Sequence, residues 1–377
     1  MNITYITNFP SIDVKYWSGL IYYMAKSLER EATVEYITGL EENWPLSLKI
    51  KNKIHGGSKI YRTDRSPEIC KGYARQILKQ LKQTTDVIFS PSTTVLSYLE
   101  TNKPKVIYTD ATFASMINYY NYFTNLGPQY IREGMRTEQL SLDSCKLAIF
   151  SSQWAADSAI RDYNTDPSKI RIVPFGANLP QQNLTLDDIK EIVKKRDSQI
   201  CKLLFLGVEW HRKGGDIAIE AVKYLNENLN LPAELHIVGI DDLSVGDLTP
   251  YIINHGRISK GTPEGVKRIE DLITQSHFLF IPSRADCTPV VFSEAMSYGL
   301  PCVSSDTGGI SSILNEGNGI MLQSGINPEE YAKQIYETFT DNKGYGELAL
   351  SAFNDYKTRL NWDVAMGKVV KYMKELS

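Results

Sequence analysis

Short apolar runs, many of them β-branched, alternate with longer segments of helical period along most of the chain. In the segment 18–31, apolar residues recur at i, i+3, i+4 and i+8, the spacing of one helix face: Leu20, Tyr23, Met24 and Leu28. Strands that alternate with helices indicate parallel sheets covered by right-handed crossovers. We predict two series of strands, the first at 3–6, 34–37, 86–89, 105–108, 147–150 and 170–173, the second at 202–206, 234–238, 278–281 and 301–304.

A polar, charged segment with few large apolar residues, 180–198, separates the two series. We therefore predict an N-terminal Rossmann-like domain over 1–180 and a C-terminal one over 181–361. A helix over about 362–377 is expected to be able to pack back on the first domain. The predicted fold class is α/β, with two doubly wound domains that face each other across a cleft. Ligands of such sheets bind beyond the carboxyl ends of the strands.

Composition and charge restrict the class of protein. Hydrophobic residues make up 42% of the chain and charged residues 23%, with a net charge of −3, so the strong basic excess of a dedicated nucleic-acid binder is missing. No apolar run approaches the ~18 residues that a membrane span needs. The N-terminus has no basic region followed by an apolar stretch, so we expect no signal peptide and a cytoplasmic protein, either free or peripheral at the inner face of the membrane. Five scattered cysteines without a C-x-x-C pair indicate reduced thiols rather than disulfides or a zinc site.

The segment 48–65 carries six basic residues against a single acid, Asp64. A charge run of this kind is typical of a solvated surface loop. The alternative is a basic lip that makes weak contact with a membrane surface or attracts an anionic acceptor.

The usual nucleotide-binding fingerprints are missing. The sequence has no G-x-G-x-x-G after the first strand, no G-x-x-x-x-G-K-[ST] and no D-x-D. Instead, Gly207 follows a predicted strand, and Arg212 and Lys213 stand just before the next predicted helix, where Gly214 and Gly215 allow close backbone approach. Two adjacent cations at a helix start suit a diphosphate. The alternative is a solvated basic turn in which Asp216 caps the helix.

A second signal surrounds a predicted helix start at 288–291. Thr288 is expected as the N-cap and Pro289 as the first helical residue, which leaves the amides of Val290 and Val291 free to bind an anion. Two acids bracket this start, and their carboxylates could accept hydrogen bonds from ribose and sugar hydroxyls. A third signal is a glycine pair at a strand end, suited to backbone contact with a ligand. The residues of these two signals are Asp286, Glu294, Gly308 and Gly309.

Together these segments resemble a family 4 glycosyltransferase, a retaining, nucleotide-sugar-dependent enzyme with the two-domain GT-B fold. The resemblance is strongest over about 200–325 and continuous in element order over 1–178. It is carried by the spacing Asp286-x7-Glu294-Ala-Met-x-x-Gly-x-Pro, by Lys213-Gly214, by Thr307-Gly308-Gly309 and by Val173-Pro174-Phe175-Gly176.

The resemblance implies a hexosyltransferase that uses a UDP- or GDP-linked sugar as co-substrate, with no metal and no other cofactor. Glu294 would bind the donor ribose and Asp286 the transferred sugar, while Arg212 and Lys213 would neutralise the diphosphate. The base would lie near 256–258, and the loop at Gly19 would approach the donor phosphates and the acceptor. The implied catalytic residues are Asp110, Arg212, Lys213 and Asp286; the implied donor-binding residues are Gly19, Gly207, Arg257, Ile258, Thr288, Pro289, Val290, Val291, Glu294, Gly308 and Gly309.

The chain departs from the family pattern at four positions. Asp286 stands where the family usually has Glu, Val208 where Arg is frequent, and Ser312 where an acid is usual. Asp110 stands where a histidine commonly ends the strand. It is expected either to bind the sugar or to cap a helix that begins near Thr112.

The predicted function is therefore a metal-independent retaining glycosyltransferase that acts on a glycan, a lipid-linked or a small-molecule acceptor. A nucleotide-sugar epimerase on the same fold and a non-catalytic glycosyltransferase-like subunit are the alternatives. The sequence leaves open the donor base, the sugar, the acceptor, the linkage and the oligomeric state.

Overall fold

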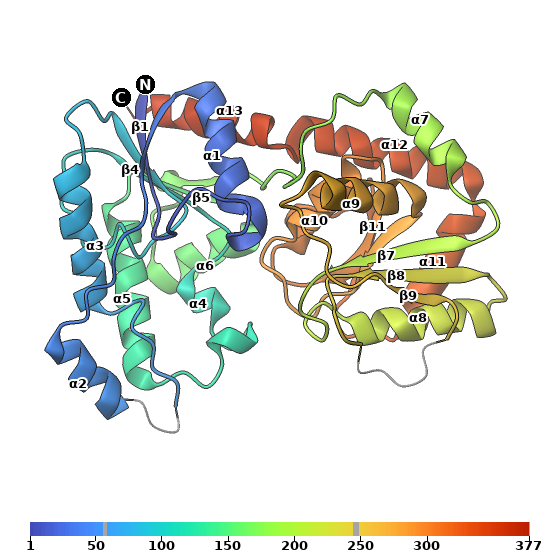
Figure 1. Ribbon diagram of the computed structural model, residues 1–377, viewed down its shortest axis with the longest axis horizontal. Coiled ribbons are helices and arrows are strands. Elements are labelled where there is room, and N and C mark those ends of the chain that lie inside the picture. Colours follow the sequence, from blue (N-terminus) through green and yellow to red (C-terminus); the bar gives the residue numbers. More distant parts are fainter. Residues whose placement is uncertain (56–58, 244–248, 377) are drawn as a thin grey trace. The chain divides into compact units, whose positions relative to one another are not determined.

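The computed structural model describes residues 1–55, 59–243 and 249–376 (Figure 1). The chain divides into two compact units, the first formed by Met1–Pro174 together with the C-terminal segment from Ala365, the second by Phe175–Val364. The division thus falls six residues before the boundary expected after 180. Each unit is built on one six-stranded sheet in which all neighbouring strands are parallel.

The first sheet has the strand order β2-β1-β3-β4-β5-β6. Its strands are β1 Asn2–Ile6, β2 Thr33–Ile37, β3 Val87–Ser90, β4 Lys105–Thr109, β5 Leu147–Phe150 and β6 Ile170–Ile172. Its helices are α1 Leu20–Glu31, α2 Leu46–His55, α3 Pro67–Gln80, α4 Phe113–Met116, α5 Pro128–Ser144 and α6 Gln153–Tyr163, with short 3-10 helices at Trp17–Gly19, Asn121–Phe123 and Pro167–Lys169. The last helix, α13 (Trp362–Lys374), joins this unit from Ala365 on, and its Tyr372 ring lies 5.3 Å from the guanidinium of Arg171.

The second sheet has the order β12-β11-β10-β7-β8-β9. Its strands are β7 Cys201–Leu206, β8 Ala233–Val238, β9 Ile252–Asn254, β10 Phe278–Ile281, β11 Cys302–Asp306 and β12 Gly319–Gln323. Its helices are α7 Leu186–Lys195, α8 Gly215–Glu227, α9 Pro263–Gln275, α10 Val290–Met296, α11 Pro328–Thr340 and α12 Asn342–Arg359, with a 3-10 helix at Ile310–Ser312.

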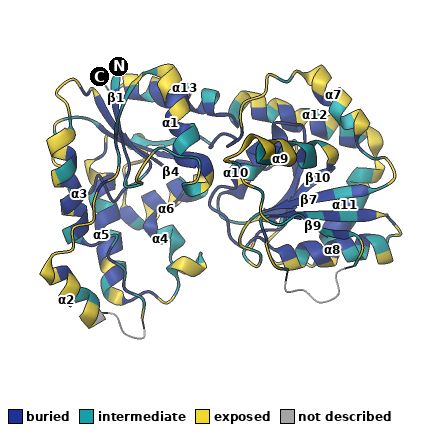
Figure 2. Cartoon of the chain, in the orientation of Figure 1, coloured by how far each residue is buried: buried dark blue, intermediate teal, exposed yellow. Residues whose placement is uncertain are grey.

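The predicted strands are all present, and the two-sheet α/β fold is confirmed. Every residue of β3, β4, β5 and β10 is buried, as expected for parallel strands covered on both faces (Figure 2). Two edge strands, β9 and β12, were not predicted. β9 has only three residues. β12 starts at a glycine, ends at a glutamine and is only partly buried. Neither strand therefore gives the long apolar run from which the other strands were predicted.

Both sheets change winding direction beside the strand that opens each unit. In the second unit, β7 lies between β8 and β10, so successive crossovers leave it in opposite directions. The loops that follow β7 and β10 lie at this winding change, at the carboxyl ends of the strands, where ligands of doubly wound sheets bind. These loops carry three of the four predicted catalytic residues, Arg212, Lys213 and Asp286.

The basic segment 48–65 is not a solvated loop throughout, and that interpretation is wrong for most of its described residues. Residues up to 55 belong to α2, and 56–58 lie outside the described residues. Lys51 Nζ lies 3.0 Å from Glu68 Oε1 and 2.7 Å from Glu133 Oε1. The Arg65 side chain is almost buried, because it reaches a buried acid of α5.

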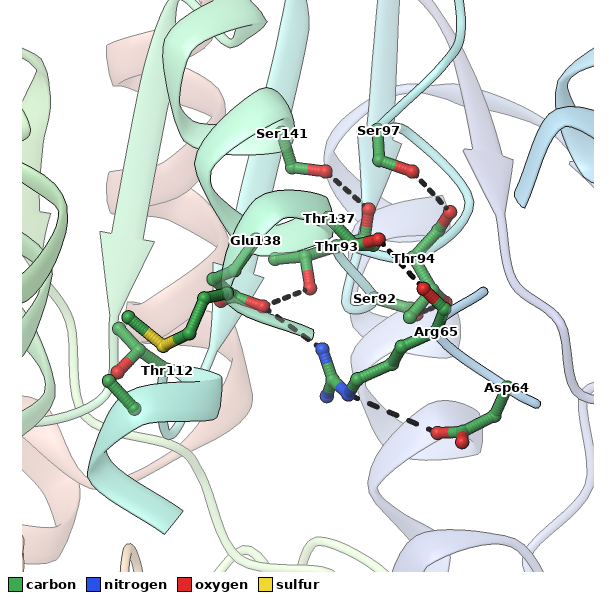
Figure 3. A network of polar contacts seen from close by, with 12 residues as sticks. Asp64, Arg65, Ser92, Thr93, Thr94, Ser97, Thr112, Thr137, Glu138 and Ser141 are labelled. Atoms are coloured by element: carbon green, nitrogen blue, oxygen red, sulfur yellow. Dashed lines mark hydrogen bonds and ion pairs between the residues drawn. The ribbon is translucent and has the colours of Figure 1, made fainter. Parts of the chain in front are cut away.

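That acid, Glu138, is the centre of a buried polar network at the carboxyl edge of the first sheet (Figure 3). Its Oε2 accepts hydrogen bonds from Arg65 Nη1 at 3.2 Å and from Thr93 Oγ1 at 2.7 Å. Thr137 Oγ1 donates to the Arg65 carbonyl at 2.9 Å, and Ser141 Oγ donates to the Thr93 carbonyl. Burial raises the pKa of Glu138 although Arg65 opposes this shift. The network ties α5 to the loop after β3 and to the segment before α3.

His277 joins β7 to β10 at the amino-terminal ends of these strands. Its Nδ1 accepts a hydrogen bond from the Lys202 amide at 3.0 Å, and its own amide donates to the Lys202 carbonyl at 2.7 Å. The side chain is 3% exposed, and burial lowers the pKa of His277 from 6.5 to about 4. The imidazole is therefore neutral in the folded protein.

We predict that this histidine makes the second unit acid-sensitive. Below pH 6.5 the unfolded chain takes up a proton at His277 that the folded chain refuses, so the free energy of unfolding falls by about 1.4 kcal/mol per pH unit down to about pH 4. Between pH 7 and pH 5 the loss from this residue is about 2 kcal/mol. Urea unfolding of the natural protein and of His277→Gln at both pH values measures it. Equal losses in the two proteins would contradict the assignment.

Candidate active site

The loops that follow β7 and β10 are joined to each other by backbone and side-chain hydrogen bonds. The Arg284 amide donates to the Arg212 carbonyl at 2.8 Å, and Arg212 Nη1 donates to the Ala285 carbonyl at 2.8 Å. Two separate sequence signals, 207–216 and 284–294, thus form one continuous surface at the winding change of the second sheet.

Three predicted catalytic residues meet on this surface. Lys213 Nζ hydrogen-bonds to Asp286 Oδ2, and both residues are buried. Arg212 Nη1 lies 3.9 Å from the same carboxylate oxygen, and Arg212 Nε donates to Glu209 Oε2 at 2.6 Å. A carboxylate predicted to contact the sugar and two cations predicted to contact the diphosphate are therefore neighbours in the folded unit.

Glycines make this approach possible. Gly214 has a left-handed backbone (φ 76°), and a Cβ at this position would lie 2.0 Å from the Pro282 carbonyl oxygen. A Cβ on Gly207 would lie 3.2 Å from Cγ of Lys213. Gly214 thus serves the contact between the two loops, and Gly207 leaves room for the lysine stem. The expected close approach of the 214–215 backbone is to neighbouring protein atoms.

The helix cap suggested for Asp216 is wrong. The N-cap residue of α8 is Gly214, and Asp216 lies within the first turn. Both carboxylate oxygens of Asp216 accept hydrogen bonds from Arg284, at 2.7 Å each. The Arg284 guanidinium lowers the pKa of Asp216. This bidentate pair is a further link between the loops after β7 and β10.

The second acid of the predicted pair also has a lysine partner. Glu294, in α10, is 1% exposed, and Lys260 Nζ lies 2.5 Å from both of its carboxylate oxygens. Sequence reasoning missed Lys260, which precedes α9 and stands 34 residues before its partner. The only available signal was indirect: a carboxylate so deeply buried requires a counter-charge or hydrogen bonds.

The predicted start of the second-signal helix is wrong by one residue. α10 begins at Val290, and Pro289 occupies the N-cap position with extended backbone. Thr288 stands one residue before the N-cap, and its hydroxyl donates to the Cys287 carbonyl at 2.6 Å. Val290 and Val291 are the first two residues of α10, so their backbone amides lie at the helix start, where the predicted role in binding an anion requires them.

The remaining predicted donor residues of the second unit lie on neighbouring loops. Gly309 donates its amide to the Asp286 carbonyl at 3.0 Å, which brings the pair Gly308-Gly309 beside the predicted sugar-binding acid. Arg257 is exposed and pairs with Asp241 at 2.8 Å, whereas Ile258 packs against the core of the unit.

Gly19 and Asp110 belong to the first unit. Gly19 ends a run of three left-handed residues, Trp17, Ser18 and Gly19, with φ of 48°, 55° and 88°. Such backbone is costly for non-glycine residues and is typical of ligand-binding loops. Asp110 directly follows β4.

The proposed capping role of Asp110 is wrong, because another residue does this work. Thr112 is the N-cap of α4: its Oγ1 accepts from the Ser115 amide at 3.1 Å, and Ser115 Oγ accepts from the Thr112 amide at 3.1 Å. The predicted role of Asp110 in sugar binding stays a prediction.

A cavity of about 580 Å³ borders the same two loops of the second unit. Its described lining comes from the loops after β7 and β10, from α8, from β11 and from the turn between β12 and α11, and includes Trp210, Ser283 and Arg284 but none of the predicted site residues. The predicted residues therefore do not line this cavity. Over the described ranges of the chain, no helix is long and apolar enough to cross a bilayer, and no cluster of three or more His, Cys, Asp or Glu is placed to hold a metal ion.

Comparison with known proteins agrees with this geometry. Residues 200–341 match the family model described as "Glycosyl transferases group 1". The UDP-Gal:alpha-D-GlcNAc-diphosphoundecaprenol alpha-1,3-galactosyltransferase of Escherichia coli is 26% identical over 179 residues, 44% of each chain. The chain spans about half the length of the curated relatives it matches.

Solved structures share the fold of the whole chain. Sucrose-phosphate synthase from Thermosynechococcus elongatus superposes with a TM-score of 0.69 at 15% identity, covering 100% of this chain and 99% of that one. Anabaena Alr3699/HepE in complex with UDP-glucose gives 0.64 at 15% identity, covering 100% of both chains. Residues 200–341 therefore match a group 1 glycosyltransferase domain, and the chain as a whole has the two-domain fold of these glycosyltransferase structures, in agreement with the resemblance to family 4.

Proposed function

We propose that this protein transfers a sugar, with retention of configuration and without a metal ion, from a nucleotide-diphosphate sugar to a carbohydrate or lipid-linked acceptor. The observation that carries the proposal is the contact of Lys213 with Asp286, with Arg212 beside them, at the winding change of a group 1 glycosyltransferase domain. A fixed cation pair next to a buried carboxylate can bind a diphosphate and a sugar hydroxyl at adjacent positions.

In this mechanism, the protein lowers the barrier mainly by stabilising the negative charge of the leaving diphosphate. As the glycosidic bond breaks, negative charge grows on the departing phosphate oxygen, and cations already in position stabilise it without reorganisation. Lys213 and Arg212 supply these cations, and Asp286 keeps Lys213 oriented before the donor binds. The departing phosphate oxygen takes the acceptor's proton, so the reaction needs no separate general base from the protein.

The Glu294–Lys260 pair supports a role in donor binding. The carboxylate of Glu294 is held at a fixed place by Lys260, and a carboxylate is a strong acceptor for the two hydroxyls of a ribose. Because ribose is present in both the donor and the nucleoside diphosphate product, this residue contributes to the binding of both.

The named relatives favour a uridine donor. The E. coli relative carries UDP-Gal and a diphosphoundecaprenol-linked sugar in its name, and Alr3699/HepE was solved with UDP-glucose. We propose UDP rather than GDP as the leaving group, a glycan or lipid-linked sugar as the acceptor, and the cytoplasmic side of the membrane as the place of reaction.

Lys213→Ala should slow transfer more than it weakens donor binding, because the lysine's charge matters most when the leaving group becomes charged. A loss of about 2–4 kcal/mol of transition-state stabilisation corresponds to roughly 30–1000-fold slower turnover. Steady-state kinetics of sugar transfer from the UDP-sugar, or of its hydrolysis, provide the measurement. Lys223→Ala, an exposed lysine of α8 paired with Glu220, is the matched control and should leave turnover unchanged. Normal turnover in Lys213→Ala would refute the assignment.

Glu294→Gln should weaken the binding of UDP and of the UDP-sugar alike, by about tenfold or more, since a charge-assisted hydrogen bond contributes about 1.5–3 kcal/mol. Thermal shifts with UDP, GDP and their sugars give both affinities, because a ligand that binds only the folded state raises its stability by mass action. The isosteric glutamine keeps the packing around Lys260. A variant that loses affinity for the UDP-sugar but not for UDP would place Glu294 at the sugar instead.

Asp110→Ala and Thr112→Ala should have opposite signatures. Thr112→Ala removes a capping box and should lower the free energy of unfolding by about 1 kcal/mol while the folded enzyme keeps its kinetics. Asp110→Ala should leave UDP affinity intact and slow transfer by about tenfold or more, as expected when a hydrogen bond to a charged group is lost. Kinetics and chemical unfolding of both variants separate the two roles. The assignment fails if Asp110→Ala destabilises the fold but transfers sugar normally.

Transfer should survive an excess of EDTA. Two fixed cations can balance the diphosphate without a divalent ion. The rate of transfer measured before and after chelation, and again after adding Mg²⁺ or Mn²⁺, tests this directly. Loss of activity with EDTA and recovery with either ion would show that a metal, and not Arg212 and Lys213 alone, stabilises the leaving group.

A further inference from the structure

Helix α2 exposes an unusual concentration of apolar side chains. Among the described residues, ten large apolar side chains are exposed, and four of them lie within 44–54: Trp44 (40%), Leu46 (73%), Ile50 (51%) and Ile54 (70%). Figure 2 shows α2 largely exposed, in contrast to the buried strands of its unit. An exposed apolar cluster of this kind marks an interaction surface more often than a scattered leucine does.

The spacing places three of these residues on one side of the helix. Leu46, Ile50 and Ile54 stand at i, i+4 and i+8, which is one stripe along α2. The opposite side holds α2 to its unit: Leu48 is fully buried, and Lys51 reaches Glu68 and Glu133. The stripe is therefore turned away from the unit by contacts that the rest of the helix makes. We call Trp44 together with Leu46, Ile50 and Ile54 the α2 ridge.

Positive charge accompanies the ridge. Lys49 and Lys53 are exposed, and each precedes a ridge isoleucine by one position, so the two lysines run along one flank of the stripe. The segment 44–55 contains no acid. The nearest acid before it, Glu42, accepts a hydrogen bond from Tyr73 at 3.1 Å and contacts the Trp44 indole at 3.4 Å.

We propose that the α2 ridge enters the interfacial region of a membrane rich in anionic lipids, with Lys49 and Lys53 at the level of the headgroups. A helix with an apolar stripe, flanking lysines and a tryptophan has the composition of a helix that lies in the plane of a bilayer interface. This proposal goes beyond the weak membrane contact expected for 48–65, because it names the apolar side chains that enter the bilayer. It also excludes Lys51 and Arg65 from that contact, since both pair with acids of the unit.

Charge distinguishes a membrane from a second copy of the chain. A symmetric contact between two ridges would bring Lys49 and Lys53 close to the same lysines of the other copy, which like-charge repulsion opposes. An anionic surface instead attracts both lysines while the ridge is buried. The proposal is independent of the chemistry at Lys213, so its test does not require sugar transfer.

The test is sedimentation of the full chain with vesicles of phosphatidylcholine alone or of an equal mixture of phosphatidylcholine and phosphatidylglycerol. We expect binding to the mixed vesicles and little to the neutral ones. The double variant Ile50→Glu, Ile54→Glu should reduce the partition coefficient by roughly tenfold or more, because two apolar side chains no longer leave water. The matched control Leu78→Glu, Ile160→Glu changes two exposed apolar residues of α3 and α6 and should bind normally.

The lysines provide a second, independent readout. Lys49→Gln, Lys53→Gln should weaken binding about fivefold for each lysine at low salt, and the difference should shrink as salt screens the surface. The proposal is overturned if the natural protein does not bind the mixed vesicles, if it binds both kinds equally, or if the control variant loses binding as the ridge variant does. Light scattering that shows a dimer dissolved by the ridge substitutions would assign the ridge to a second copy. Unchanged melting temperatures exclude misfolding as the cause.

Discussion

The contact between Lys213 and Asp286 unites two loops that leave neighbouring strands of the second sheet. An ion pair removed from water in this way gains little net stability, because desolvation of both charges offsets their attraction. Here the surrounding structure supports it: Gly214 allows the backbones to meet, and Arg212 lends a second positive charge. The pair is therefore part of the proposed binding surface rather than a source of stability.

The same principle applies to Glu294 and Lys260. Each of the two acids that define the domain has a lysine within hydrogen-bonding distance, and each lysine comes from a different part of the chain. A buried carboxylate without such a partner would be costly to keep charged. Each lysine therefore holds its acid in place, in the orientation that the proposed roles in sugar and ribose binding require.

The basic residues of the segment 48–65 fall into two groups, one paired with acids inside the first unit and one exposed at its surface. Lys51 and Arg65 turn inward, where Glu133 and Glu138 neutralise them, and Arg65 helps to join α5 to the loop after β3 (Figure 3). Lys49 and Lys53 turn outward beside an apolar stripe. A single run of cations thus contributes both to the interior of the unit and to its surface, because helical geometry sends neighbouring residues in different directions.

The sequence by itself determined the order of ten of the twelve strands in the described residues, the two Rossmann-like sheets and the second-unit loops on which the candidate site is built. Central parallel strands are buried on both faces and therefore appear as continuous apolar runs, as β5 and β10 do. Glycines and paired acids near helix starts marked these loops: the glycines allow the backbones to approach each other, and the acids are the residues proposed to bind the sugar and the ribose.

Only the tertiary structure decided which side chains meet. The cap expected at Thr288 was wrong, and so were the alternatives in which Asp216 and Asp110 cap helices, because many polar residues near a helix start are chemically able to cap and only their positions decide. Lys260 and Arg65 looked like ordinary surface cations, yet each reaches a buried acid distant in the sequence. Local propensity depends on neighbours along the chain, whereas charge pairing and burial depend on contacts that form only when the strands are assembled.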